Sequence, residues 1–365
     1  MTRVWKAYAQ ASLILRVTVA LVLGVIVGLI GGETVAVWLA PLGDLLLRLL
    51  TFLIVPIVLF TLMVGVNQSR EGSAGRVGGK VFGYYLTSSA LAIMVGLAVA
   101  TLFSPGSGMT LDESASFSVP ENPGVVDTLL NIVPDNIIGA FAELNMLGII
   151  FTALVFGIAL LKMRQSERQH AMGERLYGVI EALNEVTLKV MSGVLRTFFR
   201  EARTPMATAF ATQSSSGTLP LTVNAAHRLG IPKSIYAFSL PLGATLNMDG
   251  AAIRIAISAV FAANVIGAPL DFISMVQIVL IGTLVSVGTA GVPGAGIIMI
   301  ATVFAQVGLP IETVALLTAI DALVGMGCTA LNVTGDLVGT SVIARSEGEE
   351  LQEEFVEEAP ATVKG

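Results

Sequence analysis

Four short polar segments interrupt the apolar last third of the sequence, and their side chains could bind a cation. They supply two carboxylates, Asp249 and Asp336, and two amides, Asn247 and Asn332, together with hydroxyls and glycine-rich backbone carbonyls. Hard oxygen ligands of this kind suit Na+. Because a carboxylate among apolar helices is costly unless something binds it, the two aspartates predict a cation site. The four segments are QSSSGTLP (213–220), NMDGA (247–251), GTAGVPGAG (288–296) and NVTGD (332–336).

Some of these groups also have purely structural explanations. Either asparagine alone could be a hydrogen bond between packed helices. The serines of 214–216 could only cap a turn, and Asp321 could simply begin a helix. Free backbone N–H groups near 214–217 and 292–296 could instead receive a carboxylate, because helix N-termini carry partial positive charge. The segments together predict a cation site beside an anion site.

Other chemistries have less support in the residues. Cys328 is the single cysteine, and the two histidines, His170 and His227, fall in segments predicted to be cytoplasmic, so no soft-metal site is expected. TQSSSG is not G-x-S-x-G, and no histidine is predicted at membrane depth to activate a serine. The nucleotide loop G-x-x-x-x-G-K-[ST] does not occur. We therefore expect gradient-driven transport rather than an enzyme or a pump, with no nucleic-acid partner.

The elements that must position these groups are membrane helices. Of the 365 residues 54% are hydrophobic and only 13% are charged, with a mean hydropathy of +0.83. Soluble domains carry about twice that charged fraction. Continuous apolar runs predict helices rather than barrel strands, and the N-terminal run is interpreted as a first span rather than a signal peptide. The candidate spans are 12–31, 43–66, 81–103 and 126–161, and the last is interrupted by Pro134 and by polar residues near Glu143.

Charge distribution orients these spans. Lys and Arg flank one side while the alternate loops are acidic, so the first four spans start and finish in the cytoplasm of an inner or plasma membrane, and both termini are predicted to be cytoplasmic. Residues 174–199 have the period of an amphipathic helix at the inner interface or on the bundle. The net charge of −6 comes largely from seven acids in the last 20 residues, which predict a disordered tail.

The last third differs from the first four spans. Its apolar pieces of about 10 to 16 residues are too short to cross a bilayer, which predicts broken helices and re-entrant hairpins. Interrupted segments of this kind are typical of a transporter's central binding site.

The motifs resemble those of the dicarboxylate/amino acid:cation symporter family, the glutamate transporter homologues. SSSGTLPLT, LPLGATLNMDG, GTAGVPGAG and ALNVTGD occur in the order and spacing of that family, and YYLTSSA (84–90) in the third span is similar too. The likeness covers the first four spans and everything from about 204 to 345. It implies an all-α integral membrane fold: a homotrimeric elevator transporter in a lipid bilayer, whose mobile transport domain carries solute and Na+ past a fixed scaffold.

The resemblance also implies a division of the chain and a set of ion ligands. The implied parts are scaffold spans 1–80, a transport span 81–103, scaffold span 104–170, a shortened amphipathic segment 171–203, a transport core 204–345 with two hairpins and two broken helices, and an acidic tail 346–365. Carried over by position, the three Na+ sites are Gly243, Asn247, Asn332 and Asp336; Thr245, Met248, Ser286, Val287 and Thr289; and Asn247, Asp249, Tyr85, Ser88 and Ser89.

The substrate contacts depart from the family pattern. Gly325 and Cys328 stand where carriers of acidic amino acids have an aspartate and an arginine, Ala251 replaces a common threonine, and Gln213 stands where an arginine is frequent. A glycine cannot anchor an ammonium group, so aspartate and glutamate are disfavoured as cargo. The residues expected around the solute are Ser215, Arg254, Val292, Gly296, Cys328, Thr329 and Asn332.

Arg254 follows Asn247 by two turns on one predicted helix. We hypothesise that it replaces the lost arginine and binds an anionic group of the cargo; the alternative is a snorkelling or structurally paired arginine. A second departure is the apparent loss of two membrane spans between residues about 195 and 205.

Three functions remain open at this point. The first is symport of Na+ with a small carboxylate such as a dicarboxylate. The second is symport with a neutral amino acid, and the third is a non-transporting paralogue or membrane subunit. The sequence does not separate Na+ from H+ coupling, although the oxygen-rich segments favour Na+.

Overall fold

A computed structural model describes residues 13–68, 73–110, 130, 132–198, 205–287, 291 and 293–349. Within these ranges every regular element is an α-helix, which confirms the predicted all-α class. Several predictions lie outside the described residues. They concern Thr289, Val292, residues 199–204 of the shortened segment, residues 350–365 of the tail, and residues 126–129 and 131 at the start of the fourth predicted span.

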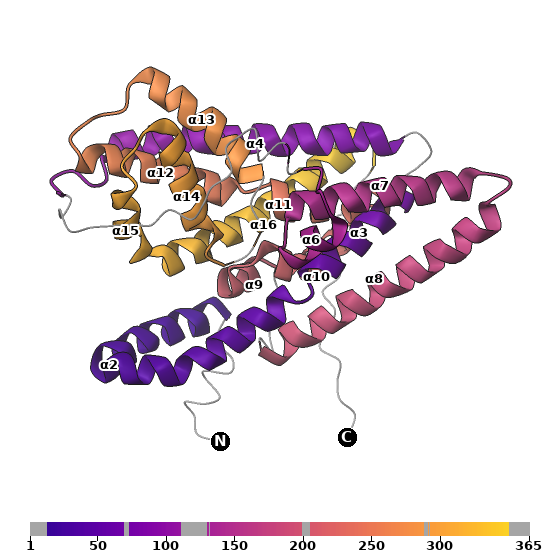
Figure 1. The fold of residues 1–365 in the computed structure, drawn as a ribbon, viewed down its shortest axis with the longest axis horizontal. Helices are drawn as coiled ribbons and strands as arrows, with labels where there is room; N and C mark the ends of the chain where they lie inside the picture. Colours follow the sequence, from indigo (N-terminus) through magenta and orange to yellow (C-terminus); the bar gives the residue numbers. More distant parts are fainter. Residues whose placement is uncertain are drawn as a thin grey trace.

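The first described helix is bent into two arms and lies at the lower edge of Figure 1. Helix α2 (Leu13–Thr51) breaks at Gly32, whose φ of 58° and ψ of −153° only glycine adopts readily. A short turn separates it from α3 (Ile54–Gln68). The predicted span 43–66 is therefore divided between the end of α2 and α3.

The next helices are longer. Helix α4 (Ser73–Phe103) runs along one edge of the molecule, and α6 (Ile137–Ala142) precedes the antiparallel pair α7 (Met146–Gln165) and α8 (His170–Phe198). Helix α7 begins just after the interruption that was predicted near Glu143, because Asn145 caps it, accepting the N–H of Gly148 at 3.0 Å. Helix α8 confirms that the segment around 174–199 is helical, while apolar side chains along it, such as Val179 and Val186, remain exposed.

The last third contains two helix–turn–helix pairs, at residues 205–228 and 272–307, and two longer helical segments, at residues 233–265 and 321–346. The helices are α9 (Pro205–Thr212), α10 (Ser215–Arg228), α11 (Lys233–Leu246), α12 (Asp249–Val265), α13 (Phe272–Val287), α14 (Ala295–Val307), α15 (Glu312–Thr318) and α16 (Asp321–Ser346). The break expected at 332–336 is not present, because α16 is continuous through it. A single helical glycine costs only about 1 kcal/mol, and Thr334 Oγ1 donates back to the carbonyl of Ala330 at 2.8 Å.

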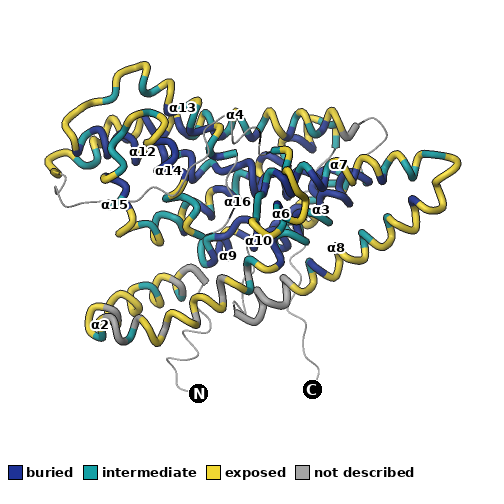
Figure 2. Tube along the Cα trace, viewed as in Figure 1, coloured by how far each residue is buried: buried dark blue, intermediate teal, exposed yellow. Residues whose placement is uncertain are grey.

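Two apolar clusters hold the helices together. One joins α3, α7, α10 and α11, and the other joins α4, α12, α13 and α14. Figure 2 shows the buried residues gathered in the middle of the bundle, with exposed residues along α2, α4, α8 and α13. Among the described residues, four helices are long and apolar enough to cross a membrane. Large exposed side chains such as Leu29, Leu102 and Phe272 match the lipid-facing surface of such a protein.

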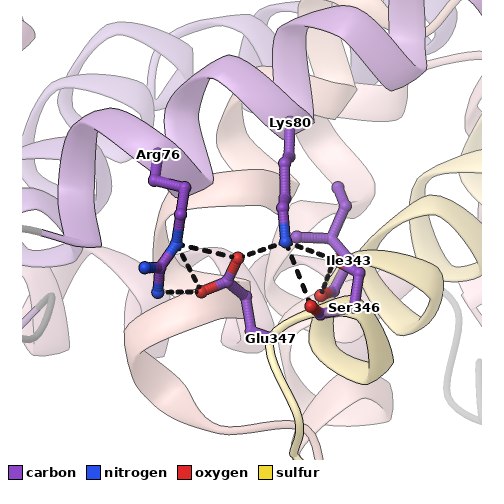
Figure 3. A network of polar contacts seen from close by, with 5 residues as sticks. All are labelled: Arg76, Lys80, Ile343, Ser346 and Glu347. Carbon is purple, nitrogen blue, oxygen red and sulfur yellow. Dashed lines mark hydrogen bonds and ion pairs between the residues drawn. The ribbon is translucent and has the colours of Figure 1, made fainter.

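A polar network fastens the start of α4 to the end of α16 (Figure 3). Arg76 and Lys80 both form ion pairs with Glu347, and Lys80 also donates to the carbonyl of Ser346 at 3.0 Å. Hydrogen bonds from the two cations hold the pKa of the Glu347 carboxyl below its usual value. The network ties the two helices that carry most of the candidate site.

Candidate functional site

The two helix–turn–helix pairs meet at their tips. Ser214 caps α10, accepting the N–H of Gly217 at 3.0 Å, and its hydroxyl donates to the carbonyl of Gly291 at 2.9 Å. A Cβ on Gly291 would lie 2.6 Å from the carbonyl oxygen of Ala244, so only glycine allows this approach to α11. The serine motif and the glycine-rich motif therefore come together, as the sequence predicted.

The interruption between α11 and α12 lies beside these tips. Asn247 ends α11, donating its backbone N–H to the carbonyl of Gly243 at 2.8 Å, and Asp249 opens α12, where the helix dipole favours an acid. The side chain of Asn247 donates to Asp336 Oδ1 at 3.1 Å and to the carbonyl of Asn332 at 3.3 Å. Helix α16 is thereby hydrogen-bonded to the break.

Two carboxylates flank this break. Asp336 is 2% exposed. Asp249 accepts hydrogen bonds from Ser88 Oγ at 2.9 Å and from Ser89 Oγ at 3.5 Å, both on α4. Within the described part of the chain neither carboxylate forms an ion pair with a basic side chain. Two acids placed together without a cationic partner are costly unless a cation compensates them.

Further acceptors surround the carboxylates. Asn247 Oδ1 is buried and has no hydrogen-bond partner among the described residues. Tyr85 is fully buried, and its hydroxyl donates to the carbonyl of Ser239 at 3.2 Å. A Cβ on Gly243 would lie 2.6 Å from Asp336 Oδ1 and 2.7 Å from Tyr85 Oη. Carboxylates, an unpartnered amide oxygen and close backbone carbonyls are the donor set that a hard cation such as Na+ requires.

The structure brings together two of the three expected ligand sets. The sets built on Asn247 with Asp336 and on Asn247 with Asp249 form one continuous cluster, which we call the cation cluster: Tyr85, Ser88, Ser89, Gly243, Asn247, Asp249, Asn332 and Asp336. The remaining set includes Thr289, which lies outside the described residues, so this set stays a prediction. Thr245 and Ser286 are buried, but each hydroxyl donates to a carbonyl of its own helix, those of Leu242 and Thr283.

A cavity of about 40 Å³ adjoins the cation cluster. Every described residue expected at the solute lines it: Ser215, Arg254, Gly296, Cys328, Thr329 and Asn332. Ser215 Oγ is buried and has no partner among the described residues, so it is available to a ligand. Asn332 and Met248 belong both to the cavity lining and to the predicted ion ligands. The anion site and the cation site are therefore neighbours.

Arg254 lines this cavity and forms an ion pair with Asp321. Its guanidinium Nη2 lies 2.6 Å from Asp321 Oδ1, and the side chains are 8% and 24% exposed. A Cβ on Gly296 would collide with Arg254 Nη1, so the guanidinium lies against the start of α14. The ion pair agrees with the alternative of a structurally paired arginine, and because Arg254 also lines the cavity, its contact with the solute stays a prediction. The sequence left Asp321 open between a helix start and a site residue; it opens α16 and also lines the cavity.

A larger cavity of about 620 Å³ lies elsewhere, between α3, α8, α10 and α11. Its rim carries Glu185, His227 and Lys233. None of the residues that the sequence singled out for solute or ion binding lines it. The small cavity next to the cation cluster is therefore the better candidate for the solute.

Buried oxygen ligands at interruptions of apolar helices, next to a small polar cavity, are the arrangement of a cation-coupled membrane transporter. A model of the sodium:dicarboxylate symporter family matches residues 13–198 and 195–346. This chain belongs to the sodium:dicarboxylate symporter family. The resemblance stated from its motifs is thus confirmed. The match also falls into two parts that meet where the loss of two spans was predicted.

Curated relatives agree with the family. The chain is 27% identical to a proton/sodium-glutamate symport protein of Bacillus caldotenax over 398 aligned positions, which cover 92% of this chain and 94% of the relative. It is 29% identical to the neutral amino acid transporter B(0) of Homo sapiens, and the alignment covers 91% of this chain and 79% of the relative. It is 27% identical to a proton/glutamate-aspartate symporter of Escherichia coli, covering 85% of each. The first alignment spans more positions than this chain's 365 residues, so that relative has residues without a counterpart here.

Proposed function

We propose that this protein is a secondary active symporter that couples Na+ influx to uptake of a small carboxylate. The observation that carries the proposal is that Asn332 belongs both to the cation cluster and to the cavity lining, where it contacts Met248. Asn332 Oδ1 accepts the N–H of Gly250 at 2.7 Å, and its Nδ2 lies 3.2 Å from Met248 Sδ. A cation bound at Asp249 and Asp336 would hold these groups in place. It would therefore lower the cost of ordering the solute site.

The cargo follows from the charges around the cavity. Arg254 is neutralised by Asp321, so a solute with two carboxylates would place its second charge near an existing carboxylate. A single carboxylate can instead be received by the unpartnered hydroxyl of Ser215, with backbone N–H groups of the second hairpin nearby. The pairing of Arg254 favours a solute with one carboxylate over the dicarboxylate first expected.

The transport step is proposed by analogy with the family. Helices α4 and α9–α16 would form the moving part, and α2, α3 and α7 the fixed part of a homotrimer with cytoplasmic termini. The ion pairs from Arg76 and Lys80 to Glu347 support joint movement of α4 and α16 (Figure 3). The helix–turn–helix pairs would be re-entrant, since their short apolar helices do not cross a bilayer alone.

Thermal unfolding of the purified protein across a Na+ titration tests ion coupling, with potassium and choline as controls. A ligand that binds only the folded state stabilises it by about 2.7 kcal/mol at 100 times its Kd. We expect a rise specific to Na+ that a small carboxylate enlarges. A rise produced equally by all three cations would contradict the proposal.

A non-transporting role is the second candidate, favoured by the division of the family match near residues 195–198. Flux separates the two functions, because a binding subunit would respond to Na+ and solute without carrying either across a vesicle membrane. Uptake into proteoliposomes under a Na+ gradient decides between them.

A further inference from the structure

Gln213 and Gly325 lie next to each other in the lining of the solute cavity. Gln213 lies in the turn between α9 and α10, and Gly325 lies on the first turns of α16; both line the cavity. A Cβ built on Gly325 would lie 2.5 Å from Gln213 Oε1, which is closer than real Cβ contacts come. The glutamine side chain therefore occupies space that any side chain at 325 would need.

The backbone of Gln213 is also held in an unusual state. Its φ of 51° lies in the left-handed region, which residues other than glycine seldom adopt. Such a conformation persists where the surroundings impose it, and it occurs frequently at binding sites. The side chain of Gln213 is only partly buried and lines the cavity, so its amide can reach a ligand there.

The uncharged amide of Gln213 matters because the two charged side chains of the cavity lining, Arg254 and Asp321, neutralise each other. Asp321 is the one carboxylate in the lining, and Arg254 already holds it at 2.6 Å. An amide donates and accepts hydrogen bonds but carries no charge, so it matches a hydroxyl group, which also does both. An ammonium group would lose its hydration on entering the cavity. No free carboxylate among the described lining residues would compensate its charge.

We propose that Gln213 determines the specificity of this site and selects a small hydroxycarboxylate over the amino acid with the same carbon skeleton. The cavity of about 40 Å³ suits a solute with few non-hydrogen atoms. This inference rests on the proposed function, since it names the class of carboxylate that the symporter takes. Gly325 contributes to this selectivity because it has no side chain and leaves room for that of Gln213.

Matched solute pairs test the proposal. The probes are lactate against alanine and malate against aspartate, each titrated into the purified full chain at saturating Na+ by isothermal calorimetry. In the unmodified protein lactate binds at least about tenfold more tightly than alanine, whereas malate, whose second carboxylate would approach Asp321, binds more weakly than lactate. Gln213→Glu supplies a free carboxylate, so it reduces this ratio by at least about tenfold while Na+ binding persists.

Alanine variants of Gln213 and Gly325, alone and combined, examine the contact itself, with Gly327→Ala as the control. Gly325→Ala displaces Gln213 and weakens hydroxy-acid binding, whereas Gly327→Ala on the same helix meets no heavy atom within 4 Å and leaves binding unchanged. The double variant Gln213→Ala with Gly325→Ala removes the clash, so its loss is smaller than the sum of the two single losses.

The outcomes separate this inference from the proposed function. If alanine or aspartate binds more tightly than its hydroxy counterpart in the unmodified protein, or if Gln213→Glu leaves the ratio unchanged, the inference is wrong and the symport proposal stands. If no carboxylate binds while Na+ still stabilises the protein, both are wrong.

Discussion

Replacing Asp336 by asparagine removes the charge at the centre of the cation cluster and nearly preserves its shape. The carboxylate is 2% exposed and accepts from Asn247 at 3.1 Å, and no described basic side chain is ion-paired with it. An unpaired buried ion costs several kcal/mol. In Na+-free buffer we therefore expect Asp336→Asn to be at least as stable as the unmodified protein, although most buried substitutions destabilise.

Adding Na+ reverses the expected order of stability, because Na+ stabilises the unmodified protein more than Asp336→Asn. At 100 times its Kd, one Na+ ion bound by the set that contains Asp336 stabilises the unmodified protein by about 2.7 kcal/mol, and this increment is absent in Asp336→Asn, whereas the set that contains Asp249 is retained. The assay is thermal unfolding in detergent from zero to saturating Na+, with ionic strength held constant by choline.

Asp271→Asn is the matched control. Asp271 lies outside the cluster, next to α13, where its Oδ1 accepts the N–H of Ser274 at 2.7 Å. Asparagine caps a helix about as well as aspartate, so this variant keeps the full Na+ response. A normal Na+ increment in Asp336→Asn would refute the assignment of Asp336 as a cation ligand.

Further predictions concern the cluster and the polar network. Ser88→Ala removes a hydroxyl 2.9 Å from Asp249, so Na+ affinity measured by calorimetry falls by about tenfold, whereas an unchanged Kd would count against the third-span contribution. Gly243→Ala places a Cβ 2.6 Å from Asp336 Oδ1, so Na+ affinity falls by at least tenfold, but Gly327→Ala has no effect on it. The lowered pKa of Glu347 means that its ion pairs stabilise the protein above the ordinary carboxyl pKa, about 4.3, and that this contribution is lost as pH falls through the lower folded value. Glu347→Gln therefore reduces the acid-side loss of thermal stability by a small amount, since Arg76 is 65% exposed to screening solvent; identical pH profiles for both proteins would contradict this.

Much of the cation cluster was predictable from sequence because its ligands lie in short motifs. Asp249 was expected to meet the serines of YYLTSSA, and Ser88 and Ser89 do donate to it. The all-α class followed from continuous apolar runs, whose length and composition require little tertiary information. Gly325 and Gln213 were recognised as departures, but their contact depends on how α16 packs against the turn between α9 and α10.

The errors have physical causes. NVTGD was expected to break a helix because it contains polar residues and a glycine, yet α16 continues through it. The polar groups are satisfied by α12 and by their own helix: Asn332 accepts from Gly250, and Thr334 donates to Ala330. Tertiary hydrogen bonds of this kind outweigh local propensity. The pairing of Arg254 with Asp321 joins residues far apart in sequence, so no local spacing could decide between a paired arginine and a solute ligand.

Flux under an ion gradient tests the central claim most directly. The measurement is uptake of radiolabelled lactate and malate into proteoliposomes with an inward Na+ gradient, compared with an inward potassium gradient of equal size. Coupled symport predicts that one of these carboxylates accumulates above equilibrium only with the Na+ gradient, and that Asp336→Asn abolishes the accumulation. Na+-dependent binding of the carboxylate without any accumulation would contradict the account and establish a binding protein that does not transport.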